Sequence, residues 1–184
     1  MRLITLICVL QFAASSFDYR GRASLEDVKS FFGNSHNIVM LHRSYNRNIS
    51  GDQPVCIYYK SSSVQGDIIR TTQSFVYGSY MDVISIRIKI SKGQFLDDAP
   101  VLEATANRGD LKKRIYHFQY YDDGDKCAVI TFNDGPGTTK CELYVWLSHV
   151  LAYNDYGNCK TEYDYMCGER KQYEVYNASC VYNN

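Results

Sequence analysis

The chain has 184 residues, and its 20 basic and 20 acidic side chains give a formal net charge of zero. A chain with this balance has no long-range field that would attract nucleic acid or an anionic membrane surface, so small molecules and proteins remain as the expected partners. Its length is enough for one domain with a substantial core and hardly enough for two.

The first residues are typical of a secretory signal. Arg2 precedes an apolar run over residues 3–14, and the small residues at the end of this run favour cleavage ahead of Phe17. A membrane-spanning helix needs about 20 apolar residues, so the run is too short to span a bilayer. We therefore expect a signal peptide over residues 1–16, a single domain over residues 17–184, and a secreted, extracellular protein.

The cysteine content fits an oxidising compartment. Cys8 lies within the expected signal, which leaves an even number of cysteines in the mature chain. No C-x-x-C pair is present, so we predict no zinc site, and no other metal or cofactor. The six remaining cysteines are expected to form disulfides, and they are Cys56, Cys127, Cys141, Cys159, Cys167 and Cys180.

A short helix is predicted at the start of the mature chain. Ser24 with Asp27 three residues later matches a capping box, which satisfies free backbone N–H groups at a helix start. The apolar residues that follow fall on one helical face. They are Leu25, Val28, Phe31 and Phe32.

The middle of the chain is predicted to be almost entirely β-strand. Runs rich in Val, Ile, Tyr, Phe and Thr recur about every ten residues and are separated by turn residues. The clearest alternation places isoleucine at every second position over residues 84–90, so one face of that strand must be buried. The expected strands are residues 37–46, 54–60, 68–77, 82–91, 100–106, 113–122, 126–132 and 139–147.

Short turns at residues 123–124 and 133–137 predict consecutive antiparallel hairpins. Eight such strands close well into an up-and-down barrel, because closure removes exposed sheet edges and leaves an interior for one small ligand. A β-sandwich is the alternative. After the last strand we predict a helix that is capped by Asn158, carries Cys159, Tyr163 and Cys167, and ends at Gly168.

Four short segments carry a resemblance to a known family. They are Asp125-Lys126-Cys127, Cys141-Glu142-Leu143-Tyr144, Gly157-Asn158-Cys159 and Ala178-Ser179-Cys180. In order and spacing they resemble the signature of the salivary lipocalins of ticks, the family that includes the histamine-binding proteins. The resemblance covers nearly the whole mature chain and implies an eight-stranded antiparallel lipocalin barrel. Tyr144 departs from it, because the family usually has tryptophan there, and Cys141 and Cys167 are not universal among members.

Six cysteines allow 15 disulfide connectivities, and the sequence alone cannot choose among them. The resemblance implies that Cys56 pairs with Cys180 and that Cys127 pairs with Cys159. It thereby leaves Cys141 and Cys167 for a third, additional bridge. A C-terminal helix tethered by disulfides to the outside of the barrel is then expected.

The resemblance places Tyr45, Tyr59 and Glu142 on the barrel interior. A carboxylate beside aromatic faces suits an ammonium ion, which favours a biogenic amine as the ligand. If Arg43 also points inward, its guanidinium could instead anchor the carboxylate of a fatty acid or leukotriene, or pair with Glu142 inside a filled barrel. Strand parity extends the interior face to Leu41, Arg43, Val55, Ile57, Tyr144 and Trp146.

Outside the barrel, Asn48 and Asn177 begin acceptor sequons, which predict exposed glycosylation sites in a secreted chain. The tripeptide Arg108-Gly109-Asp110 lies in a predicted turn. We interpret it as ordinary turn composition in preference to an integrin-binding motif. No nucleophile motif, phosphate loop or H-E-x-x-H segment is present, so we do not expect an enzyme.

These observations favour a monomeric, non-enzymatic salivary lipocalin. We expect it to contribute to immune evasion by sequestering a small host mediator of inflammation. The expected ligand is a biogenic amine such as histamine or serotonin. The alternatives are a lipid ligand, namely a leukotriene, fatty acid or sterol, and an immunomodulator that contacts a host protein through its outer loops.

Overall fold

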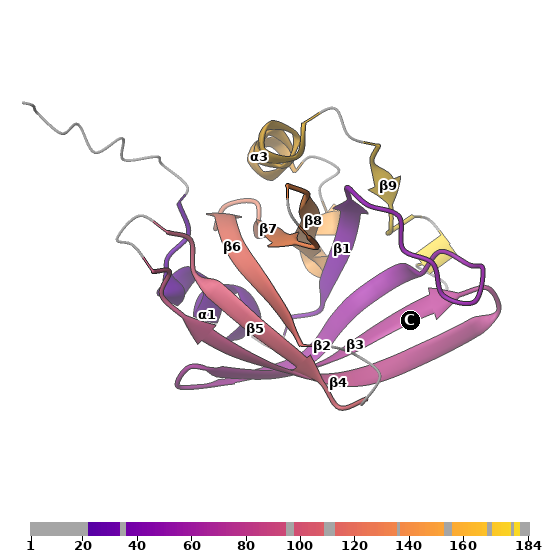
Figure 1. Cartoon of the computed structure of the whole chain (residues 1–184), viewed down its shortest axis with the longest axis horizontal. Coiled ribbons are helices and arrows are strands. Elements are labelled where there is room, and N and C mark those ends of the chain that lie inside the picture. Colours follow the sequence, from indigo (N-terminus) through magenta and orange to yellow (C-terminus); the bar gives the residue numbers. More distant parts are fainter. Residues whose placement is uncertain are drawn as a thin grey trace, which may run out of the picture.

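The computed structural model describes residues 22–33, 36–94, 98–108, 113–135, 137–152, 156–168, 171–177 and 179–180. Eight antiparallel strands close into a barrel, in which each strand pairs with its neighbours in sequence and β1 pairs with both β2 and β8 (Figure 1). The predicted lipocalin-type barrel is therefore confirmed, and the sandwich is excluded. The strands are β1 Ile38–Arg43, β2 Val55–Gln65, β3 Ile68–Tyr77, β4 Tyr80–Ser91, β5 Val101–Ala106, β6 Arg114–Asp122, β7 Cys127–Asn133 and β8 Thr139–Trp146.

The alternation along β4 shows why these segments form strands around one core. Ile84, Ile88 and Ile90 are buried, whereas Arg87 and Lys89 between them are exposed. Successive strand side chains point to opposite faces, so each strand contributes one row to the interior. The resulting inner core is the buried cluster inside the barrel, and it includes Ile57, Ile69, Ile88, Phe118 and Ile130.

Helix α1 (Leu25–Gly33) closes one end of the barrel. It begins at the predicted capping box, where the Ser24 amide donates to the Asp27 carboxylate at 2.7 Å and the Asp27 amide donates to the Ser24 hydroxyl at 3.2 Å. Phe31 and Phe32 are buried in the inner core, and both rings pack against Phe118 of β6. Ligand access at this end is therefore blocked, which leaves the opposite end as the mouth.

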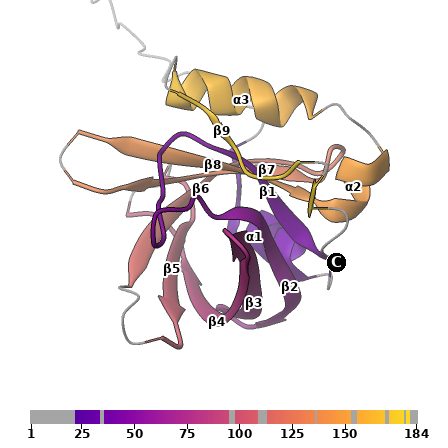
Figure 2. The ribbon, with the colours of Figure 1, turned by 90° about the vertical axis from the view of Figure 1, so that its right-hand side faces the viewer.

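Helix α3 (Gly157–Cys167) lies outside the barrel, across β7 and β8 (Figure 2). It ends at Gly168 as predicted, where the left-handed backbone with φ of 62° favours glycine. The predicted cap at Asn158 is wrong, because Tyr156 is the N-cap residue and the Asn158 amide instead donates to Asp122 at 2.8 Å. An outer core fills the space beneath the helix, and it includes Val39, Leu41, Tyr58, Val129, Leu143 and Tyr163.

Two elements were not predicted. The last predicted strand ends one residue early, and the chain then turns into helix α2 (Leu147–Ala152). A two-residue strand, β9 (Tyr173–Glu174), pairs with the outer end of β1 and brings the C-terminal segment back to the barrel.

Three disulfides tie these outer elements to the barrel. Their Cα–Cα distances are 5.2, 6.1 and 6.1 Å, which is the ordinary range for a bridge. The pairs are Cys56–Cys180, Cys127–Cys159 and Cys141–Cys167, the same three that the resemblance implies. Two of them hold α3, and the third holds the C-terminal tail against β2.

No helix in the described ranges is long and apolar enough to cross a membrane. The expected signal peptide over residues 1–16 lies outside the described residues.

Candidate ligand-binding cavity

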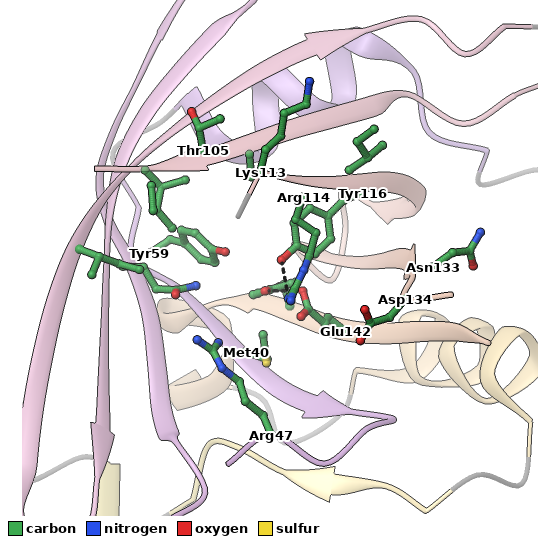
Figure 3. A pocket seen from close by; sticks show the side chains of 17 residues that line it. Met40, Arg47, Tyr59, Thr105, Lys113, Arg114, Tyr116, Asn133, Asp134 and Glu142 are labelled. Carbon is green, nitrogen blue, oxygen red and sulfur yellow. Dashed lines mark hydrogen bonds between the residues drawn. The ribbon is translucent and has the colours of Figure 1, made fainter. Parts of the chain in front are cut away.

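A cavity of about 600 Å³ occupies the end of the barrel opposite α1 (Figure 3). This volume falls within the usual range for small-molecule sites. Four strands, β1, β2, β6 and β8, form its deep wall with Met40, Tyr59, Tyr116, Glu142 and Tyr144. Its rim carries charged side chains, namely Arg47, Lys113, Arg114 and Asp134.

Glu142 provides the negative charge of this cavity. Its side chain is 2% exposed, and it is the one acidic residue in the described part of the chain that is fully buried. The Tyr144 hydroxyl donates to one carboxylate oxygen at 2.8 Å, and the Tyr45 hydroxyl donates to the other. These two hydrogen bonds hold the Glu142 carboxylate in a fixed position at the cavity wall.

The tyrosines around Glu142 stay neutral. Burial, and then the charge of Glu142, raises the pKa of Tyr59 to about 12. The same two causes raise the pKa values of Tyr45, Tyr116 and Tyr144 well above the usual range of a phenol. Four neutral phenols therefore surround one carboxylate, and the deep part of the cavity combines aromatic surface with a single negative charge.

This arrangement predicts a loss of stability at alkaline pH. A phenol whose pKa is higher in the folded state than in the unfolded state contributes stability below pH 10 that is lost as pH rises towards 12. Each such group lowers the free energy of unfolding by at most about 1.4 kcal/mol per pH unit in this range. Urea unfolding across this pH range measures the effect. The free energy of unfolding should fall less steeply with pH in Tyr59→Phe than in wild type. An identical decline in both proteins would contradict the raised pKa of Tyr59.

Arg43 points into the barrel but does not line the cavity. Arg43 stands directly opposite Glu142 in the β1–β8 register, and its side chain is 1% exposed. Burial lowers the pKa of Arg43, while Tyr45 and Glu142 act in the opposite direction. Its Nε and Nη1 atoms have no hydrogen-bond partner among the described residues, and its guanidinium carbon lies 5.8 Å from the centre of the Tyr45 ring. Arg43 is therefore a buried cation behind the Glu142–Tyr45 pair.

Two further arginines reach toward the cavity from the rim. Arg47 follows β1 and Arg114 begins β6, and Figure 3 shows both side chains directed toward the space beside Glu142. The Arg114 guanidinium lies 4.6 Å from the Phe132 ring centre and donates to the Tyr116 hydroxyl at 3.5 Å. The same two arginines also line an adjoining cavity of about 410 Å³, which continues to Phe75.

Sequence reasoning missed these rim residues for different reasons. Arg114 and Tyr116 stand on alternate positions of a correctly predicted strand, so the two-residue period of Arg114, Tyr116 and Phe118 could have identified an inward row. Arg47 lies in a loop, where no periodic signal fixes the direction of a side chain.

Two of the predicted interior residues are on the wrong face. Leu41 is part of the outer core, and Val55 packs against it. Both face outward because the strands are irregular beside them. The pairing of β1 with β8 shifts between Met40 and His42, and the pairing of β2 with β3 shifts after Val55. A bulge adds one residue to a strand and reverses the face of the residues beyond it, so simple parity fails at both positions.

Ile57 and Trp146 lie inside the barrel as predicted but do not line the 600 Å³ cavity. The Trp146 indole N–H donates to the Phe31 carbonyl at 3.1 Å, and its ring stacks on His36 at 4.0 Å. Trp146 thus joins β8 to α1 at the closed end. Of the predicted interior residues, the structure brings Tyr59, Glu142 and Tyr144 to the cavity. Tyr45 bonds Glu142 and lines the adjoining cavity, and Arg43 lies behind them.

The predicted surface features have ordinary surroundings. Asn48 is exposed and accepts a hydrogen bond from the Gly51 amide at 2.7 Å, and the Asn177 amide oxygen accepts from Ser179. Arg108 forms an ion pair with Asp82, whereas Gly109 and Asp110 lie outside the described residues. In the described ranges no cluster of three or more His, Cys, Asp or Glu side chains could hold a metal ion.

A family model described as "Tick histamine binding protein" matches residues 20–182. The chain belongs to the tick histamine-binding protein family. Among solved structures, this chain is similar to the crystal structure of AM182 in complex with serotonin. That likeness has a TM-score of 0.60 and 19% sequence identity, and it covers 83% of this chain and 90% of AM182, which supports a shared fold. A search of curated protein sequences gives no match.

Proposed function

We propose that this member of the tick histamine-binding protein family is a secreted carrier that captures a biogenic amine, such as histamine or serotonin, in its barrel. The protein acts by stoichiometric sequestration and not by catalysis, and removal of the amine from the host tissue would assist immune evasion. The family match and the fold shared with the AM182–serotonin complex support this class of ligand.

Glu142 is the single observation that carries the proposal. An ammonium ion that enters a poorly solvated cavity needs a carboxylate nearby, because an unpaired charge would lose its hydration without compensation. Glu142 meets this need from the deep wall, and Tyr59, Tyr116 and Tyr144 offer ring faces that attract a cation. Because these phenols stay neutral, the aromatic ring of the amine can pack among them at little electrostatic cost.

The arginines at the rim favour one alternative, a lipid that carries a carboxylate. Arg47 and Arg114 present two cations on the cavity wall, and planar guanidinium groups pair well with carboxylates. The small apolar extension beneath Glu142, lined by Phe32, Ile88, Leu102 and Ile130, would be the place for part of an acyl chain. Its volume is about 20 Å³, which is too small for an extended chain without rearrangement. The amine therefore remains the better fit.

Native mass spectrometry of the secreted protein separates these two ligand classes. We expect one equivalent of histamine or serotonin to be retained, and no retention of a leukotriene or fatty acid. An Arg47→Gln/Arg114→Gln variant should keep the amine, because neither guanidinium is needed to bind an ammonium ion. Retention of a lipid by wild type, and its loss from this variant, would instead assign the cavity to an anionic lipid.

A further inference from the structure

The outer face of β2 to β5 is strongly basic, although the whole chain is neutral. Arg70, Arg87 and Lys89 are exposed on this face, and Lys60 is half-buried beside them. One acid, Glu103, points the same way, and it already pairs with Lys113 at 2.8 Å. The other acid of these strands, Asp82, turns inward and lines the second cavity. The four cations therefore dominate the field over this part of the surface.

Arg70 and Arg87 are directly opposite each other in the β3–β4 pairing. Like charges in this arrangement destabilise a sheet, so the pair opposes folding while the buried neighbours Ile69 and Ile88 hold the strands together. Arg70 donates to the Gln65 amide oxygen at 3.0 Å, and within the described ranges neither arginine forms an ion pair with an acid. Two exposed guanidinium groups thus lie side by side without a carboxylate between them.

The two arginines border a groove of about 460 Å³ across β3, β4 and β5. The hydroxyl groups of Thr72 and Thr105 donate to backbone carbonyls at 3.1 and 3.2 Å. Those of Ser63 and Ser85 form no hydrogen bond to another described residue, so they can donate to a bound group. The groove therefore offers hydroxyl groups and positive charge to an occupant, and no carboxylate lines it. Its polar lining residues are Ser63, Arg70, Thr71, Thr72, Ser85, Arg87, Thr105 and Asn107.

We propose that this groove binds a sulfated polysaccharide of the extracellular matrix. Sulfate groups repeat along such a chain, so two of them can pair with Arg70 and Arg87 while the serine hydroxyls contact their oxygens. A lipid bilayer fits less well, because the apolar exposed residues of the same strand, Met81 and Val83, lie at its other end, beyond the groove. The groove lies on the outside of the barrel and shares Ile86, Thr105 and Ala106 with the lining of the ligand cavity, but neither Arg70 nor Arg87 lines that cavity. Binding through the two arginines would therefore localise the carrier without occupying the cavity.

Heparin is the probe for this site, and an Arg70→Ser/Arg87→Ser variant is the test. Binding of cations to a polyanion releases its counterions and weakens with salt. We expect wild type to be retained on immobilised heparin and the double variant to elute at clearly lower salt, with at least a five-fold lower affinity. Lys160→Gln/Lys171→Gln is the matched control, because it removes two charges from the region of α3 and β9 and should change heparin affinity less than two-fold.

Three results would overturn the proposal. The first is equal retention of wild type and the arginine variant, and the second is equal retention of wild type on heparin and on desulfated heparin. The third is binding to vesicles that contain phosphatidylserine without binding to heparin, which would assign the face to membranes. A loss of binding caused by misfolding is detected by the melting temperature, which should not fall when the opposed arginines are removed. Amine binding should also stay unchanged, so failure here leaves the proposed function intact.

Discussion

Replacing Glu142 by Gln should weaken amine binding by at least about 30-fold. Removing one partner of a buried charge pair typically costs about 2 kcal/mol or more, and about 1.4 kcal/mol corresponds to a ten-fold change in affinity. The substitution keeps the size of the side chain but removes the charge that the ammonium ion needs. Isothermal titration of histamine and serotonin into wild type and Glu142→Gln measures the effect.

The matched control is Asp134→Asn, which also removes one negative charge from the cavity lining. Asp134 lies at the rim and pairs with Lys140, so its loss should change affinity less than three-fold. Because Glu142→Gln leaves Arg43 as a buried cation without an acid on the neighbouring strand, the variant should also be less stable. Arg43→Met/Glu142→Gln removes both charges and should recover stability without recovering affinity. Wild-type affinity in either Glu142 variant would exclude the carboxylate from the binding mechanism.

The fold was predictable because local patterns and barrel closure agree. The isoleucine row of β4, the turn at Asp123 and Gly124, and the capping box at Ser24 each specify one local structure, and all are compatible with a single closed sheet. Helix α2 was missed because Leu147 continues the apolar run of β8 without a turn residue. A short apolar run does not distinguish a strand from the start of a helix.

The candidate site was only partly predictable, because two bulges decide which residues reach it. The bulge in β1 sends Leu41 outward while Met40 and Arg43 both point inward. Neither bulge contains a glycine, the residue that usually marks one in a sequence. The partners of Glu142 also depend on long-range closure, since Tyr45 is 97 residues away from it in the chain. Glu142 itself was found through family resemblance, and not through any periodic pattern.

Removal of the Cys56–Cys180 disulfide should lower the free energy of unfolding by about 5 kcal/mol. In the chain-entropy model the stabilisation grows with the length of the closed loop, and this bridge spans 124 residues. By the same relation, the 26-residue span of Cys141–Cys167 contributes about 3.5 kcal/mol. Urea unfolding of Cys56→Ala/Cys180→Ala and Cys141→Ala/Cys167→Ala, each compared with wild type, measures the two contributions.

We expect the Cys56–Cys180 disulfide to influence the ligand cavity as well, whereas the Cys141–Cys167 disulfide should not. Cys56 adopts a left-handed backbone with φ of 52°, which costs a non-glycine residue about 1 to 2 kcal/mol. Its amide donates to the Val175 carbonyl at 2.8 Å, and the Tyr58 hydroxyl donates to the Cys180 carbonyl at 2.9 Å. Without the disulfide, this strained bulge would relax and the inward direction of Tyr59 would be lost. Amine affinity should therefore fall in Cys56→Ala/Cys180→Ala and persist in Cys141→Ala/Cys167→Ala, and the reverse order would contradict a link between the bulge and the cavity.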